Sequence, residues 1–335
     1  MELDTIKAFG QTRLKVKISR RDKSVESLGE DVLKGLSSNP KTLPPKYFYD
    51  QVGSKIFEDI CKLPEYYLTR TEYTILNKYA QEIVNRFNKR ITLVELGSGS
   101  SAKTRLIISA FLKRFKKLHY IPIDISKSIL IESAKSLFKD YSNLKITALV
   151  SEYHTALDAL KRQNIGEKLI LFLGSNIGNF EKQEAEYFLK KMRVAMTEND
   201  RLLMGIDLIK DKSILEPAYN DAQGVTANFN LNLLVRINRE LDGNFDLNEF
   251  HHKAFFDEKQ GRIEMHIETT ARQVVTLREL NRRFTFEPGE TIHTENSYKY
   301  SMEEIRSLAS RAGFKMQKSW FDDKKWFSLN LLSPV

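Results

Sequence analysis

Residues Val94–Ile108 read VELGSGSSAKTRLII and decide the fold. An apolar strand runs into a glycine turn at Gly97 and Gly99, and a helical pattern begins at about Lys103. The dinucleotide fingerprint G-x-G-x-x-G has its third glycine where this chain has Ala102, which the looser form of the fingerprint allows. The pattern by itself predicts either a nucleotide-type cofactor or a merely tight turn, and it does not exclude NAD.

From about residue 91 onward, short apolar strands alternate with helical stretches, as in a parallel sheet covered on both faces. We therefore expect an α/β fold with a Rossmann-like core. The predicted strands are Ile91–Leu96, His119–Asp124, Leu144–Val150, Lys168–Leu173 and Arg201–Asp207, and the predicted helices are Lys103–Phe115, Lys127–Phe138 and Lys182–Met196.

Two stretches do not follow this alternation. The first 70 residues are polar and then rich in aromatic residues, and within them Arg13–Arg21 has the pattern of an exposed strand or arm at a solvated edge. The second stretch has a long helical region from Lys212 to about Leu241, followed by antiparallel strands around a Pro288-Gly289 turn. We expect these stretches to form a second lobe.

The tail resumes the core pattern with a helix at Met302–Ala312 and strands at Lys315–Trp320 and Phe327–Leu332. The predicted organisation is a core of residues 72–207 plus 299–335 and a second α+β lobe of residues 18–71 plus 208–298.

Composition narrows the class of protein. The chain has 335 residues, 41% hydrophobic and 29% charged, which is ordinary for a globular protein. Its net charge of +9 comes from basic residues spread among 44 acids, so no nucleic-acid partner is expected. The single cysteine, Cys61, excludes an internal disulfide and is expected in the core. Without a membrane-length apolar run or a secretory signal, we expect a cytoplasmic protein.

The strand ends favour one cofactor. Asp124 ends the second strand, where a ribose diol needs an acceptor, and Glu152 and Tyr153 follow the third, where they can meet an adenine edge and face. The turn lacks a phosphate-binding lysine-serine pair, which suits S-adenosylmethionine because that cofactor has no phosphate. Glu95 is poorly placed beside a pyrophosphate but well placed near a sulfonium or an amino group.

Five separated segments together carry a resemblance. They read FYDQVGSKIFEDICKLPEYYLTRTE, VELGSGSSAKTRLII, IPIDIS, LFLGSNIGNF and TIHTENSYKYS. In this order they resemble the histidine-specific α-N-methyltransferases of ergothioneine biosynthesis, over residues 20 to 330. The resemblance implies a class I methyltransferase core and three methyl transfers from S-adenosylmethionine to histidine, which give hercynine and S-adenosylhomocysteine.

The resemblance also implies the cofactor residues. These are Gly97, Lys103, Asp124, Glu152 and Tyr153, with Lys103 near the methionine carboxylate and the last two at the adenine. The family often has Asp and then Phe at the last two positions, so Glu152 and Tyr153 are conservative departures that bear on affinity and not on the identity of the cofactor.

For the substrate, the resemblance implies a further set of residues. Physically the set suits histidine, because a carboxylate needs donors and an imidazole needs an acidic acceptor and a hydroxyl. Glu295 and Ser297 stand two residues apart on a strand and so point to one face. The implied substrate residues are Tyr49, Tyr66, Asn179, Tyr219, Met265, Glu295 and Ser297.

The reaction that the resemblance implies is an in-line displacement by the neutral α-amine, which has a reference pKa of about 8. We expect Tyr49 to hydrogen-bond the amine and to accept or relay its proton, and the faces of Tyr49 and Tyr66 to hold the growing ammonium. No metal is expected. The histidines show no ligand spacing beyond the His251-His252 pair, which is interpreted as surface.

Three alternatives stay open at this stage. The same fold can methylate another amino acid, of tryptophan or tyrosine type, although a buried Glu295 facing an indole is unfavourable. The chain can also be a non-catalytic binding protein of this fold, or an NAD-dependent dehydrogenase. The resemblance implies a monomer.

Overall fold

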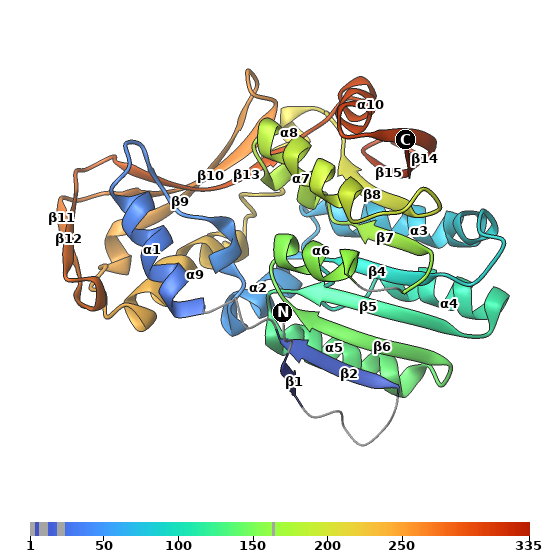
Figure 1. The fold of residues 1–335 in the computed structure, drawn as a ribbon. Helices are drawn as coiled ribbons and strands as arrows, with labels where there is room; N and C mark the ends of the chain where they lie inside the picture. Colours follow the sequence, from blue (N-terminus) through green and yellow to red (C-terminus); the bar gives the residue numbers. More distant parts are fainter. Residues whose placement is uncertain (1–3, 7–12, 19–23, 163–164) are drawn as a thin grey trace. The chain divides into compact units, whose positions relative to one another are not determined.

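The computed structural model describes residues 4–6, 13–18, 24–162 and 165–335. Contacts divide the chain into two compact units (Figure 1). The core unit comprises Met1–Asp22, Leu68–Ile209 and Lys299–Val335, and the insert unit comprises Lys23–Tyr67 and Lys210–Tyr298.

Within the described residues, the core unit holds a nine-stranded sheet of order β1-β2-β6-β5-β4-β7-β8-β15-β14. The five strands from β6 to β8 are parallel, and β15 runs antiparallel to both of its neighbours. Strand order reverses between β4 and β7, so this α/β sheet has its switch point there, as a Rossmann-like core requires. The strands are β1 Asp4–Ile6, β2 Leu14–Ile18, β4 Thr92–Leu96, β5 Leu118–Asp124, β6 Leu144–Val150, β7 Lys168–Phe172, β8 Arg201–Asp207, β14 Phe314–Phe321 and β15 Phe327–Pro334.

Helices cover both faces of this sheet (Figure 1). On one face α3, α4 and α5 share an apolar core with the strands. In α5 the buried side chains Leu130, Ala134 and Leu137 recur at helical spacing, which explains why this segment forms a helix. The helices of the core unit are α3 Tyr67–Asn85, α4 Thr104–Phe115, α5 Lys127–Asp140, α6 Tyr153–Lys161, α7 Lys182–Val194 and α10 Met302–Arg311, with a 3-10 turn η2 at Asn176–Asn179.

Strand β2 corrects the interpretation of the N-terminal segment. Leu14 and Val16 are 4% and 8% exposed, and β2 pairs in parallel with β6 inside the large sheet. Lys15 and Lys17 alternate with these buried residues, so the segment resembles an exposed strand in the sequence. Leu14–Ile18 is neither an arm nor a solvated edge. Residues 19–21 of the predicted basic stretch lie outside the described part of the chain.

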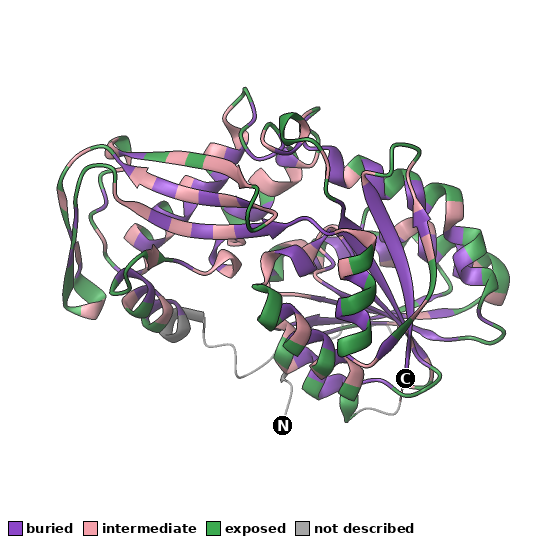
Figure 2. Ribbon diagram, turned by 90° about the horizontal axis from the view of Figure 1, so that it is seen from above, coloured by how far each residue is buried: buried purple, intermediate pink, exposed green. Residues whose placement is uncertain are grey.

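In the insert unit, the described residues form a four-stranded sheet, β3-β13-β10-β9, and a two-stranded sheet, β11-β12. Buried and intermediate residues alternate along β10, so one face of the larger sheet packs inward (Figure 2). The elements are α1 Ser24–Leu36, β3 Lys41–Thr42, η1 Pro45–Phe48, α2 Gln51–Ile60, α8 Lys212–Leu215, α9 Val225–Glu240, η3 Leu247–Glu249, β9 Phe250–Asp257, β10 Arg262–Thr269, β11 Gln273–Leu277, η4 Arg278–Leu280, β12 Arg282–Phe286 and β13 Thr291–Tyr298.

The predicted long helix from Lys212 to Leu241 is wrong, because the segment forms two helices, α8 and α9, with a non-helical connection between them. Gly224 has a φ of 71°, and the Asp221 carboxylate accepts hydrogen bonds from the backbone of Val225 and Thr226 at 2.9 and 2.8 Å. These bonds satisfy amide groups at the start of α9 and fix a new helix there.

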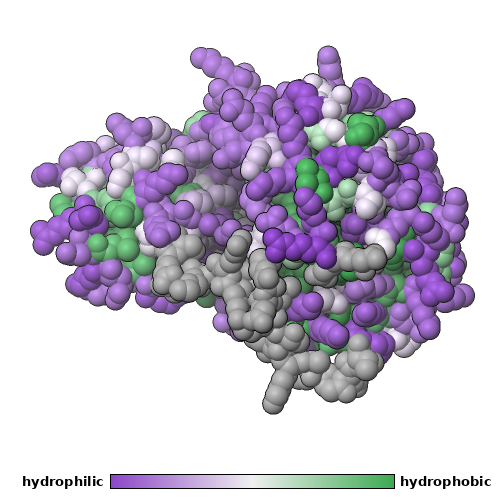
Figure 3. All heavy atoms as spheres, in the orientation of Figure 1, coloured by the Kyte–Doolittle hydropathy of each residue, from purple (hydrophilic) through white to green (hydrophobic). Residues whose placement is uncertain are grey.

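Polar side chains cover most of the described surface that is visible in Figure 3, with apolar side chains in small groups. Among the described residues, none of the helices combines the length and the apolar character needed to span a membrane.

Candidate functional site

The glycine turn follows β4, beside the point where strand order reverses. Gly97 and Gly99 have positive φ angles of 70° and 48°. The backbone N–H of Gly99 donates to one oxygen of Asp124 at 2.8 Å, and that of Ser126 donates to the other at 2.8 Å. Burial raises the pKa of the Asp124 carboxyl above its usual range. The structure thus brings Asp124 beside the turn, where it also fixes the turn's shape.

Tyr153 and Asn176 close over Gly97. A Cβ atom at position 97 would lie 2.6 Å from the Tyr153 hydroxyl and 2.8 Å from Nδ2 of Asn176. The Tyr153 ring packs edge-on against Phe172 at 5.6 Å, and burial raises the pKa of its hydroxyl, which therefore stays protonated. Glu152 precedes this ring as the N-cap residue of α6. Only glycine fits at position 97.

Lys103 forms an ion pair with Glu72 of α3. The Glu72 side chain is fully buried, whereas the Lys103 side chain is 21% exposed. The backbone N–H of Gly174, after β7, donates to both Glu72 oxygens at 2.9 and 3.0 Å. A Cβ at Gly205 would lie 1.9 Å from a Glu72 oxygen, so this glycine makes room for the carboxylate. Glu72 therefore joins the start of α4 to the end of β7.

Glu95 supports the turn from within the protein. Its carboxylate accepts a hydrogen bond from the Thr104 hydroxyl at 2.6 Å and another from the Tyr120 hydroxyl. With only 3% of the residue exposed, burial raises the pKa of Glu95 to about 7. Two buried hydroxyls thus engage this carboxylate, and the expected place of Glu95 near a sulfonium or an amino group stays a prediction.

A second cluster lies in the insert unit. The hydroxyls of Tyr219 and Ser297 are hydrogen-bonded at 2.7 Å, and the rings of Tyr66 and Tyr219 lie 6.1 Å apart in an edge arrangement. Met265 of β10 pairs in register with Glu295 of β13. Five of the predicted substrate residues are therefore gathered around β10 and β13.

Tyr49 joins this cluster through Phe57. The Phe57 ring lies 5.6 Å from that of Tyr49 and 6.2 Å from that of Tyr66. Burial raises the pKa of Tyr66 well above its usual range, and the nearby Tyr219, Cys61, Tyr49 and Glu295 raise it further. The Tyr66 hydroxyl therefore stays protonated. Asn179 ends η2 in the core unit, and its predicted contact with the substrate stays a prediction.

Two further expectations need correction. His252 is not a surface residue, since its Nε2 lies 2.8 Å from the backbone oxygen of Tyr219 and its Nδ1 lies 2.9 Å from Nδ2 of Asn230. Burial lowers the pKa of His252 below its usual range. Cys61 is partly buried rather than in the core.

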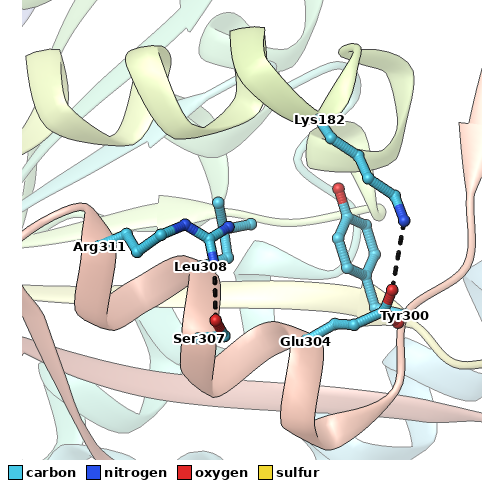
Figure 4. A pocket seen from close by; sticks show the side chains of 6 residues that line it. All are labelled: Lys182, Tyr300, Glu304, Ser307, Leu308 and Arg311. Carbon is cyan, nitrogen blue, oxygen red and sulfur yellow. Dashed lines mark hydrogen bonds and ion pairs between the residues drawn. The ribbon is translucent and has the colours of Figure 1, made fainter.

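A hollow of about 230 Å³ lies between α7 and α10 of the core unit (Figure 4). Lys182 reaches across it to Glu304 at 3.3 Å, and Arg311 contacts Ser307 at 2.5 Å. The Lys182 and Arg311 side chains are more than half exposed. None of the predicted site residues lines the hollow, so we do not assign it a role in the reaction. Its lining residues are Lys182, Tyr300, Glu304, Ser307, Leu308 and Arg311.

The glycine turn has no space for a side chain at position 97, lies beside an acid at the neighbouring strand end and stands at the switch point of the sheet, as a nucleoside cofactor requires. Residues 28–334 match the family described as histidine-specific methyltransferase, SAM-dependent. This chain belongs to that family. The predicted enzyme class and the S-adenosylmethionine cofactor are confirmed, and the dehydrogenase and non-catalytic alternatives are set aside.

Relatives of this chain align with it over most of its length. The histidine N-alpha-methyltransferase of Mycobacterium tuberculosis is 39% identical over 91% of this chain and 94% of its own length. Ergothioneine biosynthesis protein 1 of Neurospora crassa is 34% identical over 84% of this chain, which corresponds to 32% of that longer protein. An L-tryptophan methyltransferase of Psilocybe serbica is 28% identical over 91% of this chain and 92% of its own length.

Proposed function

We propose that this enzyme transfers three methyl groups from S-adenosylmethionine to the α-amino nitrogen of L-histidine, giving hercynine in the first step of ergothioneine biosynthesis. The observation that supports this substrate most is the cluster in which Tyr219 contacts both Tyr66 and Ser297, with Glu295 near enough to Tyr66 to raise its pKa. The names of relatives that are more than one-third identical to this chain agree with this substrate.

The cofactor residues belong to the core unit. In this proposal the S-adenosylmethionine supplies an electrophilic methyl carbon on a sulfonium and leaves as a neutral thioether. Gly97 leaves room for the Tyr153 hydroxyl and the Asn176 amide beside the turn, and Asp124 accepts hydrogen bonds from the ribose with the lone pairs that Gly99 and Ser126 leave. Tyr153 and Glu152 bind the adenine, and Lys103 binds the methionine carboxylate.

The substrate residues provide both kinds of partner that histidine needs. Glu295 accepts a hydrogen bond from one imidazole nitrogen, and Ser297, held by Tyr219, serves the other nitrogen. Met265, in register with Glu295, packs against the ring. Asn179 and the protonated Tyr66 donate to the substrate carboxylate.

Each methyl transfer forms one C–N bond and breaks one C–S bond, and the amine must lose a proton before it attacks. We propose that Tyr49 accepts or relays this proton through its hydroxyl. Its ring lies among Phe57 and Phe229 at 5.6 Å from each, a setting that also suits the dimethylated and quaternary ammonium. A Tyr49→Phe variant is expected to lose about 10²-fold in the rate per methyl group.

Calorimetry on protein saturated with S-adenosylhomocysteine tests the substrate. Histidine, tryptophan and tyrosine are titrated into the wild type and into Glu295→Ala, with Glu268→Ala on the same sheet as the matched control. We expect heat from histidine alone, lost in Glu295→Ala and kept in the control. Heat from tryptophan or tyrosine instead would overturn the histidine assignment while leaving the methyltransferase family in place.

We further propose that the enzyme acts as a cytoplasmic monomer without a nucleic-acid partner. The spread of basic residues among acidic ones and the single cysteine support this. Light scattering on the protein as it elutes from a size-exclusion column measures its mass and tests the monomeric state. The mass of a dimer at micromolar concentration would contradict this proposal.

A further inference from the structure

Three potential metal ligands meet on one face of the insert unit's larger sheet. His266 of β10 pairs directly with His293 of β13, and their rings stack with centroids 4.8 Å apart. Glu264 stands two residues before His266 and so shares its face of the sheet. One ligand atom from each of the three residues lies within 4.8 Å of the other two.

A β-bulge creates this meeting. The register shifts between Met265 and His266, so that Met265 pairs with Glu295 but His266 pairs with His293. Thr294 is the extra residue on β13. In a regular ladder without the bulge, His266 would pair with Thr294, and the two imidazoles would lie on opposite faces of the sheet. The bulge thus places the histidines together on the face opposite to Met265.

The surroundings orient these side chains as the outer contacts of a metal site do. Arg262 donates to one Glu264 oxygen at 2.6 and 2.8 Å, while the other oxygen lies 2.9 Å from Nε2 of His266. Nε2 of His293 lies 3.2 Å from the backbone oxygen of Glu295. A neutral imidazole that donates from Nε2 keeps its lone pair on Nδ1. Carbonyl-bound histidines and hydrogen-bonded carboxylates are the usual ligands of protein metal sites.

His266 packs between two rings and is hydrogen-bonded to Glu264. The Phe255 ring stacks on it at 5.5 Å, and its Nδ1 is buried without a hydrogen-bond partner among the described residues. If the ring turns toward a cation, it gives up its hydrogen bond to Glu264 and part of its stacking on Phe255 and His293. All three side chains are partly buried, so an ion held by them is shielded on the protein side.

We propose that Glu264, His266 and His293 bind one Zn²⁺ ion, with a water molecule in the fourth position. Two imidazoles and a carboxylate are a ligand set for a borderline divalent cation and not for Mg²⁺ or Ca²⁺, which prefer oxygen ligands. Tetrahedral ligands about 2 Å from the ion stand about 3.3 Å apart, so the cluster closes by side-chain rotation on binding. The site is independent of the proposed methyl transfer, because it lies on the other face of the sheet.

The test is a calorimetric titration of ZnCl₂ into tag-free protein treated with EDTA and then desalted. We expect one Zn²⁺ per chain, no heat from MgCl₂, and affinity at least tenfold weaker in His266→Ala and in Glu264→Gln. His251→Ala, which removes an exposed histidine from the adjacent strand β9, is the matched control and is expected to bind as the wild type does.

Thermal unfolding in EDTA verifies that each variant is folded, and the rise in Tm on adding Zn²⁺ provides a second readout. We expect this rise in the wild type and in His251→Ala only, because a ligand that binds the folded state stabilises it. The proposal is overturned if the wild type takes up no saturating equivalent of Zn²⁺, or if His251→Ala loses as much affinity as His266→Ala.

Discussion

Glu72 and Lys103, which follows the glycine turn in the sequence, form an ion pair. The carboxylate is fully buried and the ammonium side chain is partly exposed. The same carboxylate accepts two hydrogen bonds from the backbone of Gly174. A buried carboxylate is costly unless it is paired and hydrogen-bonded, so Glu72, Lys103 and Gly174 depend on one another. The proposed contact between Lys103 and the cofactor is thus set by a residue of α3.

Glu72→Gln is expected to weaken the binding of S-adenosylhomocysteine at least tenfold. Glutamine has nearly the same shape and still accepts from Gly174, but it leaves Lys103 without its charged partner. Charged hydrogen bonds of this kind contribute about 1.5–3 kcal/mol. Calorimetric titration of S-adenosylhomocysteine measures the change.

The matched control for Glu72→Gln is Glu82→Gln on the same helix, where the side chain is 45% exposed and lies 3.7 Å from Arg86. This control is expected to bind as the wild type does, because exposed ion pairs contribute little. Equal affinity in the two variants would show that Glu72 does not position Lys103.

Gly97→Ala is expected to abolish measurable cofactor binding, whereas Gly166→Ala is not. Both glycines have positive φ angles, 70° and 75°, so alanine meets similar backbone strain at each. Of these two positions, the new Cβ would meet neighbours only at Gly97, at 2.6 Å from the Tyr153 hydroxyl, while at Gly166 no described residue lies within 4 Å. Titration of S-adenosylhomocysteine compares them. Similar losses in both variants would assign the effect to backbone strain alone.

Glu95 gives the stability of the protein a specific pH dependence. Its pKa is about 7 in the folded state and 4.5 as a reference, so the folded protein holds this proton more tightly than the unfolded chain. Its contribution to stability is complete below pH 4.5 and is lost as the pH rises to about 7. Between pH 5.5 and 8 this loss is about 2 kcal/mol.

Glu95→Gln removes this titration. We expect the free energy of unfolding of the wild type to fall, relative to that of the variant, by about 2 kcal/mol between pH 5.5 and 8. Urea unfolding at the two pH values measures the difference, with the exposed Glu303→Gln as the control. A constant difference across this range would mean that Glu95 is ionised throughout.

The sequence predicted the core well because its strands are continuous apolar runs that end at turn residues. Arg201–Asp207 was predicted with the bounds that the structure gives, as was Leu144–Val150. Strand β2 was misinterpreted because Lys15 and Lys17 alternate with the buried Leu14 and Val16. Periodicity shows that one face is apolar, but it does not show which sheet covers that face.

The site was less visible in the sequence. Glu72 and Asn176 stand inside motifs that were noticed, yet their partners, Lys103 and Gly97, come from other elements. The pairing of His266 with His293 depends on a bulge at Thr294, which shifts the register by one residue and leaves no sign in residue spacing. Contacts between separate elements need the register and the strand order, which the structure supplies.

The hydrogen bond between Tyr219 and Ser297 makes a prediction about substrate binding. Because Tyr219 is 5% exposed and Ser297 is 4% exposed, their hydroxyls have little access to water as an alternative partner. If Tyr219 orients Ser297 toward the imidazole, Tyr219→Phe and Ser297→Ala should each weaken histidine binding about fivefold to tenfold, and the double variant should be little worse than either one. Calorimetry with histidine, on protein saturated with S-adenosylhomocysteine, measures all four affinities. Multiplying losses in the double variant would mean that the two hydroxyls act on histidine independently, and unchanged affinity in both single variants would remove them from the substrate site.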